Sequence, residues 1–302
     1  MFDGKAVGRV CLARLEQLGH FFFYIALRLF GHRGGRALLV PVVLSYVVFS
    51  RKIHGITGHY LQRRFPGESR RTYWRYTYKN ILSFGSVLVD RGWLGISRDA
   101  ALQGEFVGYD RLVELVSRGR GLILLTAHVG NWQSALAHLG GLPVKVHALM
   151  QYDQQAAAKH FFDLQGGGRR PFEIIDADGA FGGMIDAAAA LGRGEVVTIM
   201  GDRYIKGSSS VVEFFGKPVR LPDSAYQLAS SVQAPVAVLL AAKTGKISYQ
   251  LKLWDCFYPT YEKREERDEM LRQCSAHYIK VVEEYLKDYP FQWYNFYDFW
   301  KQ

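Results

Sequence analysis

The sequence has 302 residues, of which 49% are hydrophobic and 22% are charged. This length allows one large domain or two small ones, and the composition excludes a wholly disordered chain. The formal net charge of +10 lies at the front, because residues 1–80 contain 14 Lys and Arg against three acids, whereas residues 81–302 contain 24 against 25. This distribution argues against a uniformly basic nucleic-acid-binding protein and indicates an anionic partner at one end of the chain.

The most apolar part of the chain, residues 20–50, consists of two blocks, Phe21–Phe30 and Ala37–Phe49, on either side of a polar break. Neither block reaches the ~20 residues that span a bilayer, and no small-residue cleavage site follows to indicate a signal peptide. We expect two short helices in the interface of an anionic membrane, with cations at the level of the phosphates. A tilted single span and a buried helical hairpin in a soluble core are the alternatives.

Residues 57–80 follow as a predicted amphipathic helix that carries further cations. We therefore divide the chain into a basic, hydrophobic, membrane-associating segment, residues 1–80, and a body, residues 81–302. Three widely spaced cysteines, Cys11, Cys256 and Cys274, predict no disulfide framework and indicate a reducing compartment.

The body alternates short apolar runs with helical patterns. The predicted strands are 121–127, 144–150, 171–176, 195–200, 234–242 and 247–253. The predicted helices are 109–117, 132–139, 154–163, 182–191, 223–231 and 268–286. Such alternation indicates an α/β fold with a mixed central sheet flanked by helices. Residues 211–222 turn at Gly216-Lys217-Pro218, and are expected to form either a hairpin lining a pocket or plain core.

Two polar clusters follow predicted strands, where α/β folds place their sites. The first runs from His128 through Asn131 and Trp132 to Gln133 after strand 121–127, and histidine suits general-base chemistry near neutral pH. The alternative is a capped helix start with an ordinary histidine. The second cluster, residues 201–207, contains Asp202, Arg203 and Lys206 after strand 195–200. It is either a substrate-orienting site or a surface loop with an ion pair.

Several motifs together resemble the lipid A late acyltransferases, the lauroyl and myristoyl transferases of the glycerophospholipid acyltransferase superfamily. The pieces that carry the resemblance, in family order, are the hydrophobic front, Tyr60–Pro66, Phe84–Ser86, Gly104 to Gly121, His128–Trp132, Gly201–Arg203, Phe214–Val219, Leu221-Pro222 and Pro290–Phe296. They cover nearly the whole chain, and the Gly-Asn-Trp after the histidine and Phe-Phe-Gly-Lys-Pro-Val are fairly specific.

The resemblance implies that His128 takes a proton from an acceptor hydroxyl or amine, which then attacks an acyl thioester. In the family, an acid five residues after the histidine orients and charge-stabilises the imidazolium, but position 133 is Gln. Three interpretations follow: the acceptor is easily deprotonated, another acid (most plausibly Asp202) supplies the charge, or the chain is a non-catalytic lipid binder. The proposed catalytic set is His128, Gln133 and Asp202.

The resemblance also implies substrates, partners and a location. Asn131, Trp132, Arg203, Lys206 and Lys217 are the proposed substrate-binding residues. No metal and no cofactor is expected, because His128 has no His or Cys partner at ligand spacing, and acyl carrier protein or coenzyme A carries the acyl co-substrate. The expected partners are an anionic membrane surface, a lipid or glycolipid acceptor and an acidic acyl carrier protein, at the cytoplasmic face of a bacterial inner membrane. A scaffolding role in a lipid or pigment pathway is the alternative.

Overall fold

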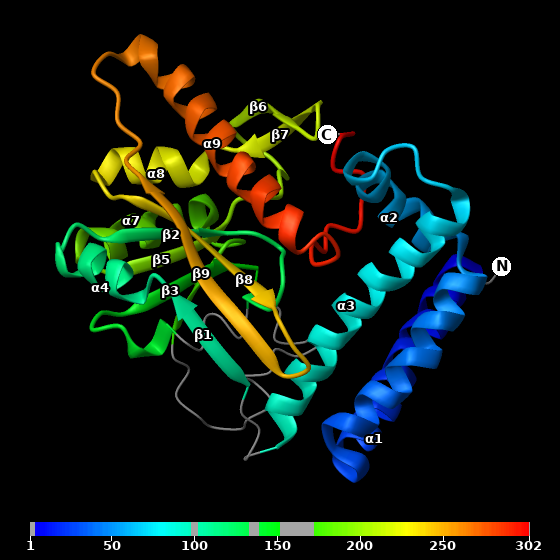
Figure 1. The fold of residues 1–302 in the computed structure, drawn as a ribbon. Coiled ribbons are helices and arrows are strands. Elements are labelled where there is room, and N and C mark those ends of the chain that lie inside the picture. The colour runs from blue at the N-terminus through cyan, green and yellow to red at the C-terminus, as the bar shows by residue number, and fades with distance from the viewer. Residues whose placement is uncertain (1–3, 98–101, 133–138, 152–171, 302) are drawn as a thin grey trace.

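A computed structural model describes residues 4–97, 102–132, 139–151 and 172–301 of the chain. Its centre is a seven-stranded sheet with the strand order β1-β9-β8-β2-β5-β3-β4 (Figure 1). The strands are β1 (Gln103–Val107), β2 (Leu122–Thr126), β3 (Val146–Met150), β4 (Glu173–Asp176), β5 (Val196–Met200), β8 (Val236–Lys243) and β9 (Ser248–Phe257). All neighbours are parallel except β8 and β9, so the sheet is mixed and the predicted α/β class is confirmed.

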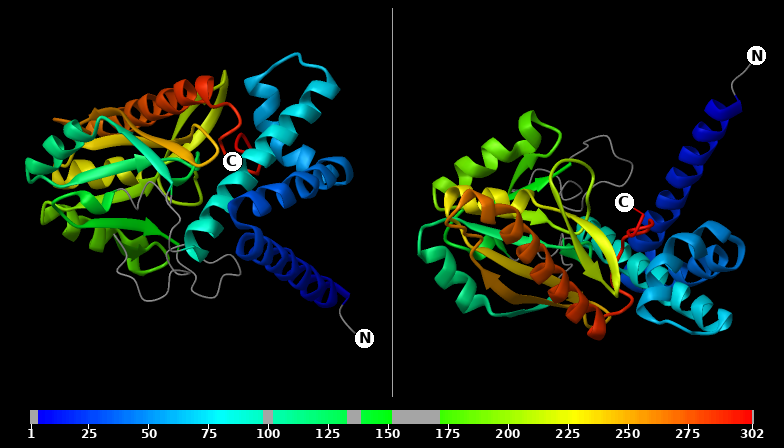
Figure 2. Two further views of the ribbon diagram at one scale, coloured as in Figure 1. Left: turned by 60° about the horizontal axis from the view of Figure 1, so that its bottom comes forward. Right: turned by 90° about the horizontal axis from the view of Figure 1, so that it is seen from above.

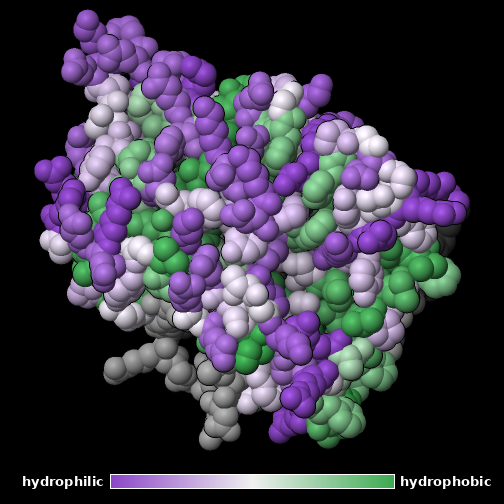
Figure 3. Space-filling model, in the orientation of Figure 1, coloured by the Kyte–Doolittle hydropathy of each residue, from purple (hydrophilic) through white to green (hydrophobic). Residues whose placement is uncertain are grey.

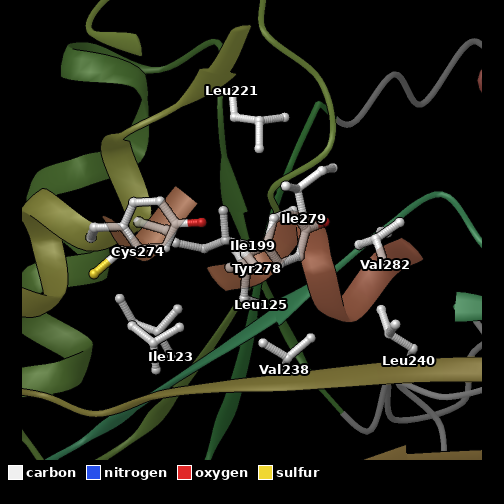
Figure 4. Packing of buried hydrophobic residues seen from close by; sticks show 14 of the residues in the cluster. Ile123, Leu125, Ile199, Leu221, Val238, Leu240, Cys274, Tyr278, Ile279 and Val282 are labelled. Carbon is white, nitrogen blue, oxygen red and sulfur yellow. The ribbon is translucent and has the colours of Figure 1, made fainter. Parts of the chain in front are cut away.

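Helices cover both faces of this sheet and bury its strands on both sides. The helices of the body are α4 (Tyr109–Ser117), α7 (Met184–Gly192), α8 (Ser224–Val232) and α9 (Arg267–Asp288), with 3-10 turns at η1 (Leu139–Gly141), η2 (Ala180–Gly183) and η3 (Arg264–Glu266). One core packs α7, α8 and α9 against residues such as Ile123 and Leu125 (Figure 4). The other core packs α4 against Leu122 and Leu124. Burial on both faces explains why these strands read as continuous apolar runs.

All six predicted strands are present within a few residues of their predicted bounds, and β1 is an additional strand at the sheet edge. Its first three residues are exposed, so it lacks the apolar run that marks the others. Residues 211–222 form a separate hairpin, β6 (Ser209–Phe214) and β7 (Lys217–Pro222). The predicted helix 154–163 and all but the ends of the predicted helix 132–139 lie outside the described residues.

The front consists of three helices, α1 (Gly4–Phe49), α2 (Arg51–Arg64) and α3 (Arg70–Ile96). The prediction of one helix over 57–80 was wrong, because the chain turns between α2 and α3 at Pro66 and at Gly67, whose φ is 79°. The predicted polar break in α1 is a sharp kink at Gly31. α3 continues past residue 80 and is in contact with the body through its C-terminal half.

The second half of α1 packs against α3, whereas the first half projects away from the body (Figure 2). Among the described residues no single helix is long and apolar enough to cross a membrane. The pair 21–49 and 51–64, bent by 91°, reaches the required length and composition together.

Residues 289–301 form an aromatic tail between α9 and the front helices (Figure 1). Asn80 of α3 donates to the carbonyls of Phe291 and Trp293 at 3.1 and 3.2 Å, and the Tyr60 hydroxyl of α2 donates to Pro290 O at 2.7 Å. The front helices thereby hold the tail against the sheet.

Candidate active site

The two predicted polar clusters meet at one edge of the sheet. β2 and β5 are parallel neighbours whose last residues, Thr126 and Met200, are paired in register. The chain leaves β2 towards His128 and leaves β5 towards Asp202, so both side chains emerge from the carboxyl edge. Gly201 N donates to Thr126 O at 2.9 Å and holds the two strand ends together.

His128 and Asp202 form a close, largely buried pair. The Nδ1 atom of His128 lies 2.7 Å from Asp202 Oδ1, and the backbone N–H of His128 donates to Asp202 Oδ2 at 2.9 Å. The histidine side chain is 20% exposed and the aspartate side chain only 1%. Because the carboxylate engages Nδ1, the Nε2 atom is the ring nitrogen left for a reacting group.

Asp202 Oδ2 accepts two further hydrogen bonds, both from the C-terminal tail. Trp293 Nε1 donates at 3.0 Å and Asn295 Nδ2 donates at 2.8 Å. Burial is the largest single influence on the pKa of Asp202 and raises it, but the charge and hydrogen bonds of His128, with the charge of Arg203, bring the pKa down to about 2. The carboxylate is therefore ionised throughout the physiological pH range.

Arg203 acts on the same cluster through Asn295. Its Nε donates to Asn295 Oδ1 at 2.6 Å and its Nη2 donates to Tyr294 O at 3.2 Å. Since the amide oxygen is held by the guanidinium, the amide nitrogen of Asn295 faces the Asp202 carboxylate.

The tail also pairs directly with the backbone around His128. Tyr294 N donates to His128 O at 2.9 Å, and Gly130 N donates to Gln292 O at 3.0 Å, on either side of an antiparallel bridge between Val129 and Trp293. Gly130 has a φ of 50°, and a Cβ atom there would lie 2.0 Å from the backbone oxygen of Ala241 in β8. Glycine is therefore required at this position.

The other predicted site residues lie at varied distances from this pair. Asn131 is buried in the His128 loop and interacts with Tyr249 of β9. Lys206 is exposed in the loop after β5, and Lys217 is exposed at the turn of the β6–β7 hairpin. Gln133 lies outside the described residues. Trp293 and Asn295 were absent from the predicted site, although both lie in Pro290–Phe296, one of the segments that carry the family resemblance.

An apolar pocket opens beside the pair, at the carboxyl ends of β2, β3 and β5. Its lining is Leu124, Thr126, Trp132, Leu139, Ala148, Leu149, Met150, Thr198, Ile199, Met200 and Leu239. The predicted substrate residue Trp132 is thus part of the pocket wall. Within the described part of the chain, no three His, Cys, Asp or Glu side chains are grouped so as to hold a metal ion.

This arrangement defines an α/β protein with a buried His–Asp pair next to an apolar pocket. A protein-family model described as bacterial lipid A biosynthesis acyltransferase matches residues 24–302. The chain belongs to this family of acyltransferases, as its motifs predicted. No curated protein matches the sequence.

Proposed function

We propose that the protein transfers a fatty acyl chain from the thioester of acyl carrier protein or coenzyme A to a hydroxyl or amine of a lipid or glycolipid acceptor. His128 is the general base and Asp202 is its charge partner. The observation that carries this proposal is the 2.7 Å contact between His128 Nδ1 and the buried Asp202 carboxylate, beside the apolar pocket.

In the proposed reaction, Nδ1–H of His128 donates to Asp202 and Nε2 accepts the proton of the acceptor. The acceptor oxygen or nitrogen forms a bond to the thioester carbonyl carbon, and collapse of the tetrahedral intermediate breaks the C–S bond. The protonated histidine returns its proton to the leaving thiolate. Asp202 stabilises the imidazolium between these two steps, as the acid of a His–acid pair does.

In this proposal, Asp202 supplies the negative charge that the glutamine at position 133 lacks. A neutral amide cannot offset the charge on a protonated histidine, whereas the carboxylate of Asp202 reaches the same ring from the neighbouring strand end. The low pKa of Asp202 and its three additional donors keep that charge fixed in place. These contacts favour an active enzyme over a non-catalytic lipid-binding or scaffolding homologue.

The pocket suits the acyl chain of the donor. Thr126, Met150 and Met200, the last residues of their strands, line the pocket, and Thr126 lies two residues before His128 in the sequence. An acyl chain bound there would present its thioester near the Nε2 atom. Burying each methylene contributes about 0.8 kcal/mol, so the depth of the pocket would select chain length.

The exposed apolar residues of the front support docking on the cytoplasmic face of the inner membrane. Along α1, Phe30 is 71% exposed and Phe49 is 84% exposed, and the region of α1 is a hydrophobic surface in Figure 3. Exposed cations lie nearby: Arg28 and Arg33 on α1, and Arg51 at the start of α2. Apolar side chains with adjacent cations fit the interface of an anionic bilayer.

The test is acyl transfer from acyl carrier protein or coenzyme A thioesters to glycolipid and lysolipid acceptors. His128→Ala is expected to abolish transfer. His277→Ala is the matched control, because His277 is also paired with an aspartate at 2.7 Å, to Asp255, on the exposed side of α9. Equal activity of His128→Ala and wild type refutes the assignment, and lipid binding without transfer by wild type supports the scaffolding role.

Gln133→Glu is a further arm of the same assay. If Asp202 supplies the charge, a second acid near the ring adds little, and kcat should rise only slightly. A large gain would show that the pair with Asp202 is incomplete on its own.

A further inference from the structure

A second buried ionic cluster lies behind the site, and the proposed reaction uses none of its side chains. Asp90 of α3 is fully buried, and it accepts hydrogen bonds from Lys243 Nζ at the end of β8 and from the Tyr249 hydroxyl of β9. His32 of α1 lies against the same carboxylate, with Nε2 at 2.6 Å from Oδ1. One carboxylate thus joins two front helices to two strands of the sheet.

The charges of this cluster are costly to bury. Burial lowers the pKa of Lys243, and the charge and hydrogen bond of Asp90 act in the opposite direction. Burial and the neighbouring Asp90 charge both raise the pKa of Tyr249, so its hydroxyl stays protonated and donates. A buried ion pair is often no more stabilising than an apolar pair of similar volume, so a cluster of this kind suggests a role in fixing geometry.

The first route from Asp90 to the site passes through Lys243 and the tail. The backbone N–H of Lys243 donates to Gln292 Oε1, and Gln292 Nε2 donates back to Lys243 O, both at 2.8 Å. The backbone oxygen of Gln292 in turn accepts from Gly130 N at 3.0 Å. One residue, Gln292, therefore links the backbone of Lys243 to the loop that carries His128.

The second route passes through Tyr249. Its hydroxyl donates to Asp90, and the same side chain interacts with Asn131, three residues after His128. Tyr249 and Asn131 are both buried, at 6% and 1% exposure, so this contact is shielded from water. The two routes reach the His128 loop at consecutive residues, Gly130 and Asn131.

We propose that Asp90 is a positioning residue for acyl transfer: through Lys243 and Tyr249 it fixes the segment 128–131 against β8 and β9, and so sets where the His128 ring stands relative to the pocket. The inference rests on the proposed role of His128. A displacement of about 1 Å at a reacting group can cost about 10²-fold in rate, so a small shift of this loop would be visible in kcat.

The experiment separates positioning from simple stabilisation by a double variant. Asp90→Asn leaves the Lys243 ammonium buried without its counter-charge and should lower both Tm and kcat. The pair Asp90→Leu with Lys243→Leu removes both charges, and its Tm should return to near the wild-type value. Its kcat should stay at least tenfold below wild type with KM for the acyl thioester little changed, because neither route is anchored.

Tyr249→Phe tests the second route alone. It keeps the buried ring but removes the hydroxyl, so we expect a kcat loss of about tenfold, equivalent to about 1.4 kcal/mol, at nearly wild-type Tm. Asp255→Asn, which breaks the surface pair with His277, is the control and should change neither value.

Recovery of kcat together with Tm in the double leucine variant would overturn the proposal and reduce the cluster to a stabilising element. Loss of activity in His128→Ala with full activity in every Asp90 variant would overturn it while leaving the proposed function intact. If wild type transfers no acyl chain, the NMR signal of the labelled His128 imidazole gives the readout instead. That signal should shift in the double leucine variant and not in Asp255→Asn, and an unchanged signal would refute the positioning role.

Discussion

Replacing Asp202 by asparagine tests the proposed chemistry with the smallest change in shape. Its Oδ2 accepts three hydrogen bonds, from His128 N, Trp293 Nε1 and Asn295 Nδ2. An amide nitrogen cannot stand there, because it would face three donors. The new NH2 group must therefore take the Oδ1 position, 2.7 Å from His128 Nδ1.

In that orientation the asparagine donates to Nδ1, and the ring carries its proton on Nε2. The histidine is then the wrong tautomer to accept a proton from the acceptor, and no carboxylate offsets the imidazolium. The corresponding change in the Ser-His-Asp triad lowers kcat by about 10⁴-fold, equivalent to about 5.4 kcal/mol. We expect a loss of this order in kcat, with KM for the acyl thioester much less affected.

The assay is steady-state acyl transfer with Asp202→Asn, wild type and Asp255→Asn, each checked by circular dichroism for the wild-type fold. Asp255→Asn breaks the other His–Asp pair at the same 2.7 Å distance and should retain full activity. A fall in kcat of less than about tenfold for Asp202→Asn would refute Asp202 as the charge partner.

Four further predictions follow from the same contacts. Asn295→Ala removes one hydrogen bond to a charged group, worth about 1.5–3 kcal/mol, and should lower kcat by about 10- to 100-fold in the same assay. Gly130→Ala places a Cβ atom 2.0 Å from Ala241 O and should give protein that fails to fold or is inactive, and a normal Tm would contradict this. The pKa of Asp202 falls from 3.8 to about 2 on folding, which adds roughly 2 kcal/mol to the free energy of unfolding. This contribution is complete above pH 4 and is lost as the pH falls towards 2. Urea unfolding across this range should therefore show a loss of stability in wild type that Asp202→Asn lacks. Ala148→Phe fills the pocket and should shift the preferred thioester to shorter acyl chains, and an unchanged preference would place the chain elsewhere.

The sequence contained enough information to place His128 and Asp202 each at the end of a strand. Both follow apolar runs, which are typical of strands buried on two faces, but such runs do not show which strands are neighbours. The pairing of Thr126 with Met200 then brings the two polar clusters together.

The hydrogen bonds that complete the site could not be predicted in this way. Trp293 and Asn295 lie 91 and 93 positions after Asp202, in a tail whose aromatic residues show neither a helical nor a strand period. Nothing local distinguishes the tryptophan that donates to Asp202 from the others in the tail. The break between α2 and α3 is a different case, because Pro66 and Gly67 are ordinary turn residues whose local signal was outweighed by the amphipathic pattern on either side.

The pairing of the tail with the His128 loop has a consequence for how the protein acquires activity. The contacts of Asp202 join positions 74 and 91 residues apart, so the site draws on three separate parts of the chain. A chain folded only as far as α9 would hold His128 and Asp202, but Asp202 would lack Trp293 and Asn295 and the loop would lack its backbone bridge. The site is therefore complete only when the tail lies against the sheet.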